Sequence, residues 1–359
     1  MLQRSTETIL ALHSPGMLSG LGQKVQFLLL VRNVILTSVI ALFDSVSRRT
    51  LCFWEISAQV AEPRTLETLH PGRAGDVLGI LTEKGRQCMS CISDRELPQK
   101  PIKVEIGKAT HKGMVRTHNE DSLISLVFPF SEGSEQRFLG FYAIADGLGG
   151  YEGGEVASSL ALRMLAENIG KSLLLPRLKG ETHGLNQELA LQVLTEGVET
   201  ANNEVYTQGK GSNMGTTLAA VLLLNKTAYI ANVGDSRVYL LDGGQIRQIT
   251  KDHSLVAKLV EVGEITPEEI YTHPRRNIIT RYMGMQQDIE VDLFAEVLKP
   301  NTSLILCSDG LWEMVRDNEI KDIVLKADNA QTASKKLVEV ANRNGGVDNI
   351  SVVVVKVVG

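Results

Sequence analysis

Short runs of apolar and β-branched residues, separated by turn residues, follow one another along the chain after Ile102. Such runs are typical of β-strands. The turn sequence Asp242-Gly243-Gly244 joins two of them closely enough for a hairpin, so we expect a mainly antiparallel sheet. The predicted strands cover residues 122–128, 138–145, 216–224, 228–233, 237–241, 245–250, 303–307 and 350–357.

Helical periodicity, with apolar residues three and four positions apart, appears between these strands. It predicts helices over residues 155–169, 187–206, 254–262 and 330–342. The apolar runs at residues 218–224 and 351–355 lack alternation, so both faces of those strands should be covered. Two packed sheets with helices on each outer side satisfy this, which predicts an α+β fold, a four-layer α-β-β-α sandwich.

The chain before residue 102 has a different pattern. Residues 25–43 are apolar over a length that could span a bilayer, but Arg32 and Asn33 interrupt them near the middle. A central arginine costs about 2.5 to 3.5 kcal/mol on insertion scales, so spanning is marginal. At 100° per residue the polar positions fall on one line, which predicts an amphipathic helix.

Three interpretations of that helix stay open: it packs on a partner, lies on a membrane, or spans one as a signal anchor with Arg48 and Arg49 on the cytoplasmic side. A fourth is that the segment is not part of the working protein, because Met89 would start a shorter chain. Residues 61–101 are rich in proline and glycine and predict a linker. We therefore divide the chain into an extension at 1–60, a linker at 61–101 and a domain at 102–359.

Composition narrows the class of partner. The 359 residues carry a net charge of -5, which leaves no basic footprint for nucleic acid. Only four cysteines are present, which fits a reducing compartment without a disulfide framework.

Five aspartates stand where an apolar run meets a turn: Asp121, Asp146, Asp235, Asp309 and Asp348. Asp-Gly and Asp-Asn pairs are also ordinary turn signals, so each alone has a structural explanation. Together they could converge only through the fold, and their mutual repulsion would then require bound cations. Hard oxygen ligands favour Mg²⁺ or Mn²⁺.

The motifs around these aspartates resemble a known family. In chain order they are Arg116-x-x-Asn119-Glu120-Asp121, Asp146-Gly147-x-Gly149-Gly150, Met214-Gly215-Thr216-Thr217, Gly234-Asp235-Ser236-Arg237, Ser308-Asp309-Gly310 and Asp348-Asn349. This series is similar to the signature of PP2C-type (PPM) metal-dependent protein serine/threonine phosphatases. The resemblance covers about residues 103–358.

The resemblance implies a binuclear Mn²⁺ or Mg²⁺ centre at one end of the sandwich. Asp146 would bridge the two metals, the Gly147 carbonyl would bind one of them, and Asp309 and Asp348 the other. Asp121 and Glu120 would hold metal-bound waters. Asp235 with Asp309 resembles a third-metal site of bacterial members, and Arg116 would grip the phosphate.

One position departs from the animal members, which have histidine where this chain has Leu148. The general acid is therefore unassigned. A metal-bound water is one candidate; His111, His118 and His253 are others by position, or they are solvated loop residues.

Residues 251–285 resemble the flap subdomain of bacterial members and carry a local group of positive charges, Arg275, Arg276 and Arg281. A mobile, polar loop of this kind suits contact with a substrate. Such a patch could steer phosphopeptides or be an ordinary solvated face.

The expected function is hydrolysis of phosphoserine and phosphothreonine on proteins, opposing a Ser/Thr kinase, by a monomer. One alternative is a catalytically silent binding module, which missing metal ligands would mark. Another is a sigma-factor-regulator type of phosphatase. The Arg116 motif and the flap argue for the first interpretation over this one.

Overall fold

The computed structural model describes residues 102–132, 135–149, 153–181, 185–210 and 214–358. All of these residues belong to one compact unit, Glu96–Gly359, the second of two units into which the chain divides. The predicted extension, its helix at 25–43 and the whole of the linker at 61–101 lie outside the described residues. Within the described ranges, no helix is long and apolar enough to cross a membrane.

The second unit is built on two five-stranded sheets in which every neighbouring pair is antiparallel. The first sheet has the order β1 (Lys103–His111), β12 (Ile350–Val358), β11 (Ser303–Cys307), β8 (Arg237–Asp242) and β9 (Gln245–Gln248). The second has the order β10 (Asp292–Val297), β7 (Thr227–Val233), β6 (Leu218–Leu224), β3 (Glu135–Ala145) and β2 (Ser122–Glu132). A short pair, β4 (Gly147–Leu148) and β5 (Gly215–Thr216), extends one end.

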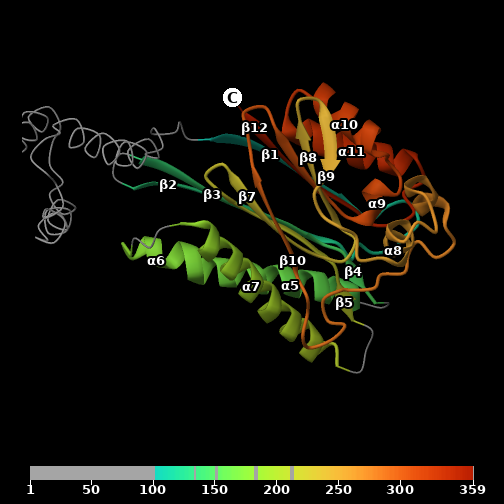
Figure 1. The fold of residues 1–359 in the computed structure, drawn as a ribbon, viewed down its shortest axis with the longest axis horizontal. Helices are drawn as coiled ribbons and strands as arrows, with labels where there is room; N and C mark the ends of the chain where they lie inside the picture. The colour runs from blue at the N-terminus through green and yellow to red at the C-terminus, as the bar shows by residue number, and fades with distance from the viewer. Residues whose placement is uncertain (1–101, 133–134, 150–152, 182–184, 211–213, 359) are drawn as a thin grey trace, which may run out of the picture. The chain divides into compact units, whose positions relative to one another are not determined.

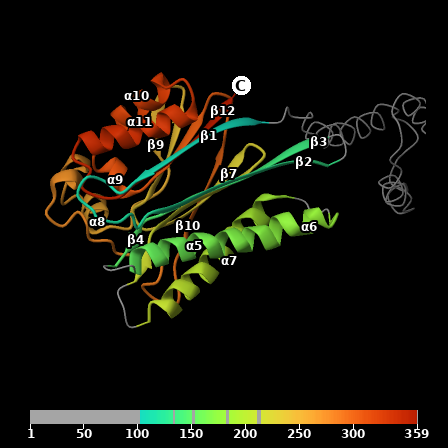
Figure 2. The ribbon, with the colours of Figure 1, turned by 180° about the vertical axis from the view of Figure 1, so that it is seen from behind.

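Helices cover the outer faces of both sheets (Figures 1 and 2). On the second sheet lie α5 (Gly153–Ile169), the π-helical turn η2 (Gly170–Leu174), α6 (Leu175–Leu178) and α7 (Gln187–Gln208). On the first lie α9 (Asp309–Trp312), α10 (Asp317–Lys326) and α11 (Ala330–Arg343). The segment between β9 and β10 contains α8 (Leu255–Glu261) and the 3-10 helix η3 (Pro267–Thr272).

Strand alternation divides the core into layers. In β3, Phe141 and Ala143 pack under α5 and α7, whereas Tyr142 and Ile144 face the other sheet. Every residue of β6 and β11 is buried. The central strands are therefore covered on both faces, and the predicted α-β-β-α sandwich is confirmed.

The predicted elements all occur, with small shifts of their ends. The range predicted at 216–224 is split, because Thr217 lies between β5 and β6. Sequence patterning missed β1, β10 and α10, as well as the short elements β4, η2, α6, η3 and α9. The two longer missed strands, β1 and β10, lie at sheet edges, where exposed side chains alternate with half-buried ones, so neither is a long unbroken apolar run.

Candidate metal centre

The five aspartates meet at one end of the sandwich. Asp121 precedes β2 and Asp146 follows β3, and these strands pair so that Ser122 is opposite Ala145. Asp235 lies between β7 and β8, Asp309 follows β11, and Asp348 precedes β12. Because the strands are antiparallel, these ends lie together, beside β4, β5, α8 and α9 in Figure 1.

The carboxylates act on one another electrostatically. Burial and the charges of Asp121, Asp309, Asp235 and Asp348 raise the pKa of Asp146 well above its usual value. Burial also raises the pKa of Asp121 to about 6 and that of Asp235 to about 7. Burial and Asp235 raise the pKa of Asp309 strongly. This cluster holds more negative charge than the surrounding protein compensates.

Several of these oxygens have no partner. Oδ1 of Asp121, of Asp235 and of Asp309 are buried and accept no hydrogen bond. Buried polar atoms are normally satisfied, so unpaired anionic oxygens point to a cationic ligand. In the described part of the chain no three Asp, Glu, His or Cys side chains close around a single point. A divalent cation would therefore complete its shell with backbone carbonyl oxygens and solvent, as hard cations commonly do.

The backbone of Asp146 is fixed on both sides by threonines of the Met214-Gly215-Thr216-Thr217 motif. The Asp146 N–H donates to Thr217 Oγ1 at 3.0 Å, and the Thr217 N–H donates back to the Asp146 carbonyl at 2.9 Å. Thr216 Oγ1 donates to the same carbonyl at 2.8 Å. This motif therefore positions the aspartate at the end of β3.

Gly147 lies in a tight cradle. A Cβ at this residue would be 2.2 Å from the carbonyl oxygen of Gly154 and 2.6 Å from that of Glu120. The start of α5 and the loop before β2 can approach only because no side chain intervenes. The peptide that was predicted to supply a carbonyl ligand thus lies beside Glu120, whose pKa is raised by burial.

Asn349 organises the loop that carries the other motif. Its Oδ1 accepts from the Glu120 N–H at 2.7 Å, and its Nδ2 donates to the carbonyl oxygens of Lys112 and His118, each at 2.9 Å. Ser308 Oγ donates to Asp121 Oδ2 at 2.8 Å. The Asp348-Asn349 and Ser308-Asp309 motifs thereby lock Glu120 and Asp121 in place.

Arg116 stands at the rim of the cluster. Its Nη2 is 2.7 Å from Asp348 Oδ2, and its side chain is 55% exposed. The hydrogen bond to Asp348 raises the pKa of Arg116. A guanidinium held from one side by a carboxylate keeps other N–H groups able to donate to an incoming phosphate.

A second buried charge system lies behind Asp235. Arg237 pairs with Asp252 at 2.6 Å and donates to Tyr239 Oη at 2.9 Å. Its guanidinium stacks 3.7 Å from the centre of the Trp312 ring, and Trp312 Nε1 donates to the Asp235 carbonyl at 3.0 Å. The Gly234-Asp235-Ser236-Arg237 motif is thus anchored through its arginine.

The histidines do not share one environment. His111 and His118 are exposed, as a solvated loop interpretation requires. His253 is buried: its Nδ1 accepts from the Gly234 N–H at 2.9 Å, and its Nε2 is 2.8 Å from Arg281 Nη1. The solvated interpretation is therefore wrong for His253, because its ring joins the Asp235 turn to the flap.

The predicted positive patch on the flap is largely neutralised. Arg276 lies 3.5 Å from Glu313, and Arg281 pairs with Glu290 and Asp292 at 2.7 and 2.8 Å. These arginines tie the flap to the domain instead of standing free in solvent.

Sequence reasoning missed Glu313. It lies four residues after Asp309, where its backbone N–H donates to the Asp309 carbonyl, and its charge raises the pKa of both Asp309 and Asp235. The i to i+4 spacing from Asp309 was the available signal.

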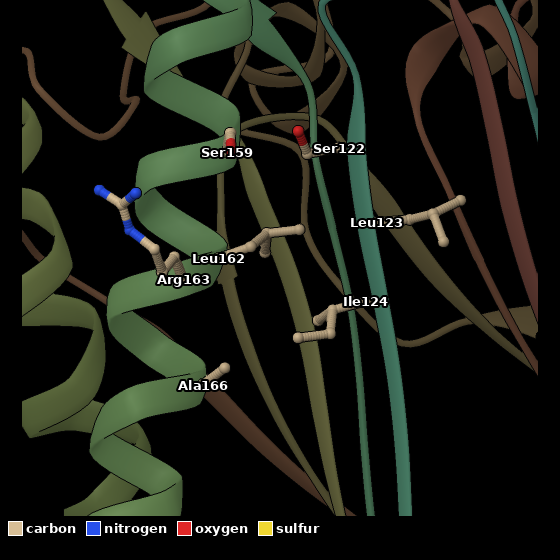
Figure 3. A pocket seen from close by; sticks show the side chains of 7 residues that line it. All are labelled: Ser122, Leu123, Ile124, Ser159, Leu162, Arg163 and Ala166. Atoms are coloured by element: carbon tan, nitrogen blue, oxygen red, sulfur yellow. The ribbon is translucent and has the colours of Figure 1, made fainter.

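A pocket also lies between β2 and α5 (Figure 3). Its lining is Ser122, Leu123, Ile124, Ser159, Leu162, Arg163 and Ala166. Arg163 extends away from the strand, so polar groups do not converge there as they do in a catalytic site.

Comparisons with known proteins agree with this geometry. The family model for protein phosphatase 2C matches residues 107–261 and 295–350. The serine/threonine phosphatase Stp of Listeria welshimeri is 37% identical over 247 residues, which cover 69% of this chain and 93% of that protein. The protein phosphatase PhpP of Streptococcus pneumoniae is 32% identical over 255 residues, covering 70% of this chain and 97% of that protein.

Solved structures give the same result. The serine/threonine phosphatase PstP/Ppp of Mycobacterium tuberculosis superposes with a TM-score of 0.59 and 33% identity, covering 72% of this chain and 100% of that one. The catalytic domain of PstP in complex with two manganese ions gives a TM-score of 0.58 at 32% identity, with the same shares covered. From its motifs, its sandwich and these matches, the chain belongs to the protein phosphatase 2C family.

Proposed function

We propose that residues 102–358 hydrolyse phosphoserine and phosphothreonine on proteins with the help of divalent cations. The observation that carries the proposal is the buried group of aspartates with unpaired oxygens, bordered by Arg116. An anionic cluster alone would repel a phosphate. With cations bound and a guanidinium at its rim, it would attract one.

The donor set supports a specific set of ligands. Asp146, the Gly147 carbonyl, Asp309 and Asp348 would hold two Mn²⁺ or Mg²⁺ ions, and Asp121 and Glu120 would orient water around them. Asp235, together with Asp309, would take a third ion. When bound, such ions neutralise a phosphate dianion and acidify water.

The protein's own residues have separate roles. Arg116 donates parallel N–H groups to phosphate oxygens, and Asp348 holds that guanidinium in position. Thr216 and Thr217 hold the backbone of Asp146, so the strand end that carries its carboxylate is in position before an ion binds. Leu148 offers no proton, and the buried ring of His253 is held by Gly234 and Arg281, so the proton for the leaving oxygen would come from water or from the exposed His111 or His118.

The cellular setting is also part of the proposal. The catalytic unit would act in the cytoplasm as a monomer, opposing a Ser/Thr kinase, with residues 25–43 as a membrane-associating segment. The sparse cysteines support a reducing compartment, and Cys307 is a free, buried thiol.

The test is release of phosphate from phosphothreonine and phosphoserine peptides by the full chain. Activity should require Mn²⁺ or Mg²⁺, vanish in EDTA, return when Mn²⁺ is restored, and resist okadaic acid. Asp309→Ala should abolish it. Cation-independent turnover, or turnover by Asp309→Ala close to that of the wild type, would refute the proposal.

A silent binding module is the alternative from another class. It would bind phosphopeptides without turning them over. The complete donor set and the intact Arg116 pair give no support to that alternative.

A further inference from the structure

Arg116 lies in the loop between β1 and β2, and this loop contacts the loop between α11 and β12. The Met114 N–H donates to the Gly346 carbonyl at 2.7 Å. Gly113 has a φ of +78°, and a Cβ there would lie 2.2 Å from the carbonyl oxygen of Asp348. The two loops therefore contact each other backbone to backbone, which fixes the shape of the surface that they form.

Three apolar side chains on these two loops are exposed to solvent. Met114 is 66% exposed, Val115 is 67% exposed and Val347 is 39% exposed. Single exposed apolar residues are common, but a group of them on two adjoining loops indicates a contact surface. Methionine in particular is frequent on surfaces that accept varied partners.

The position of this group identifies its occupant. Val115 directly precedes Arg116, and Val347 directly precedes Asp348, the residue to which Arg116 is bonded at 2.7 Å. Residues with apolar, exposed side chains therefore adjoin both members of the ion pair at the proposed phosphate site. A polypeptide whose phosphate reaches Arg116 would pass near these residues.

We propose that this apolar ledge, defined as Met114, Val115 and Val347, binds an apolar side chain of the substrate within two residues of its phosphorylated serine or threonine. Consecutive Cα atoms are about 3.8 Å apart, and an extended peptide rises about 3.3 Å per residue. Because Met114 is two residues from Arg116 in the chain, their Cα atoms lie at most about 7.6 Å apart, a distance that about two residues of extended substrate would span. The inference rests on the proposed function, since Arg116 fixes where the phosphate lies.

The experiment uses a set of phosphothreonine peptides in which one of the positions from −2 to +2 is leucine or serine. The full chain in Mn²⁺ should show, for at least one position, a kcat/KM about tenfold higher for the leucine peptide, as burial of a small apolar group produces. The double variant Met114→Ser/Val115→Ser should bring that ratio close to one. Val347→Ser, on the other loop, should lower it as well.

The matched control is Leu178→Ser. Leu178 is 69% exposed in α6, beyond the far end of α5 from the site, so the leucine-to-serine ratio should stay at its wild-type value. The wild-type ratio is informative by itself, because it does not depend on whether a variant folds.

Two outcomes would overturn the inference. A wild-type ratio near one at every position means that the ledge contacts no substrate. If, in addition, the wild type binds to itself at high concentration and the serine variants do not, the ledge binds a second copy of the chain instead of a substrate. Hydrolysis of p-nitrophenyl phosphate by the wild type tests the proposed function separately, so failure of one is distinguishable from failure of the other.

Discussion

Two groups of buried charge lie only two residues apart along the chain and are balanced in opposite ways. Asp235 belongs to the acidic cluster and has an unpaired buried oxygen. Arg237 is almost completely buried against Asp252, and each nitrogen that faces this carboxylate donates to it. Burial opposes the charge on Arg237, but Asp252 outweighs it and raises the pKa of Arg237 well above its usual value.

The difference shows where the chain neutralises its own buried charge and where it does not. At Arg237 the chain supplies both the cation and the anion, and Tyr239 and Trp312 take up the remaining faces of the guanidinium. At the aspartate cluster the chain supplies mainly anions, with Arg116 outside at the rim. The first arrangement needs nothing from solution, whereas the second is stable only with protons or cations.

The largest expected effect comes from Asp146→Asn, which removes a central charge while keeping the shape of the side chain. Turnover in Mn²⁺ should fall at least about a thousandfold, or about 4 kcal/mol, because cation binding is lost. Yet in EDTA the variant should melt at a higher temperature than the wild type, since one repelling charge is gone.

The control for that variant is Asp242→Asn. Asp242 is a partly exposed hairpin aspartate paired with Lys299, so neither turnover nor melting in EDTA should change appreciably. Differential scanning calorimetry with and without Mn²⁺ measures the stability arm. A lower melting temperature of Asp146→Asn in EDTA would mean that the charge of the aspartate cluster is already neutralised within the chain. The cluster would then not differ from the Arg237 and Asp252 pair.

The next effect is on stability alone. Asp252→Asn leaves the Arg237 charge buried without an anion and should lower the free energy of unfolding by about 3 to 5 kcal/mol. Urea unfolding should give a loss of this size in Mn²⁺ and a smaller one in EDTA, because the charge of Asp252 also repels Asp235 when no cation is bound. Replacing both partners, as Arg237→Met/Asp252→Leu, should recover part of the loss. A loss below about 1 kcal/mol for the single variant would contradict the assignment of this pair.

The sequence predicts the interior of this fold better than its edges. Strands β6 and β11 are runs of apolar residues because both faces are covered, and such runs are visible without coordinates. In β1, polar side chains alternate with half-buried ones, and its place at the sheet edge depends on pairing with β12, which is far away in the chain. Edge strands of this kind are specified by a partner more than by their own pattern.

The candidate site shows the same limit. Aspartates beside glycine at strand ends could be found from local pattern, because the turn chemistry is local. The Arg237 and Asp252 pair and the burial of His253 could not be, since they arise where β8, the segment after β9 and the flap pack together. Contacts between distant segments leave little trace in the sequence of either one.

The smallest expected effect concerns His253. This buried side chain is favoured in its uncharged form, and so it differs both from the charged Arg237 and from the aspartate cluster. Burial, and then Arg281, lower the pKa of His253 below its usual value. A depressed histidine pKa gives stability that is present above about pH 6.5 and is lost as pH falls, because the unfolded chain takes up the proton first.

His253→Asn keeps an acceptor for the Gly234 N–H but cannot titrate. In urea unfolding, the variant should be about 1 kcal/mol less stable than the wild type at pH 8. That gap should narrow between pH 6.5 and pH 5, where only the wild type loses stability through this ring. The aspartates titrate in both proteins, so their contribution cancels in the difference. A gap that widens as the pH falls from 8 to 5 would show that His253 is charged in the folded protein, with Asp292 as its counter-ion at 3.3 Å, and would place it with the Arg237 pair.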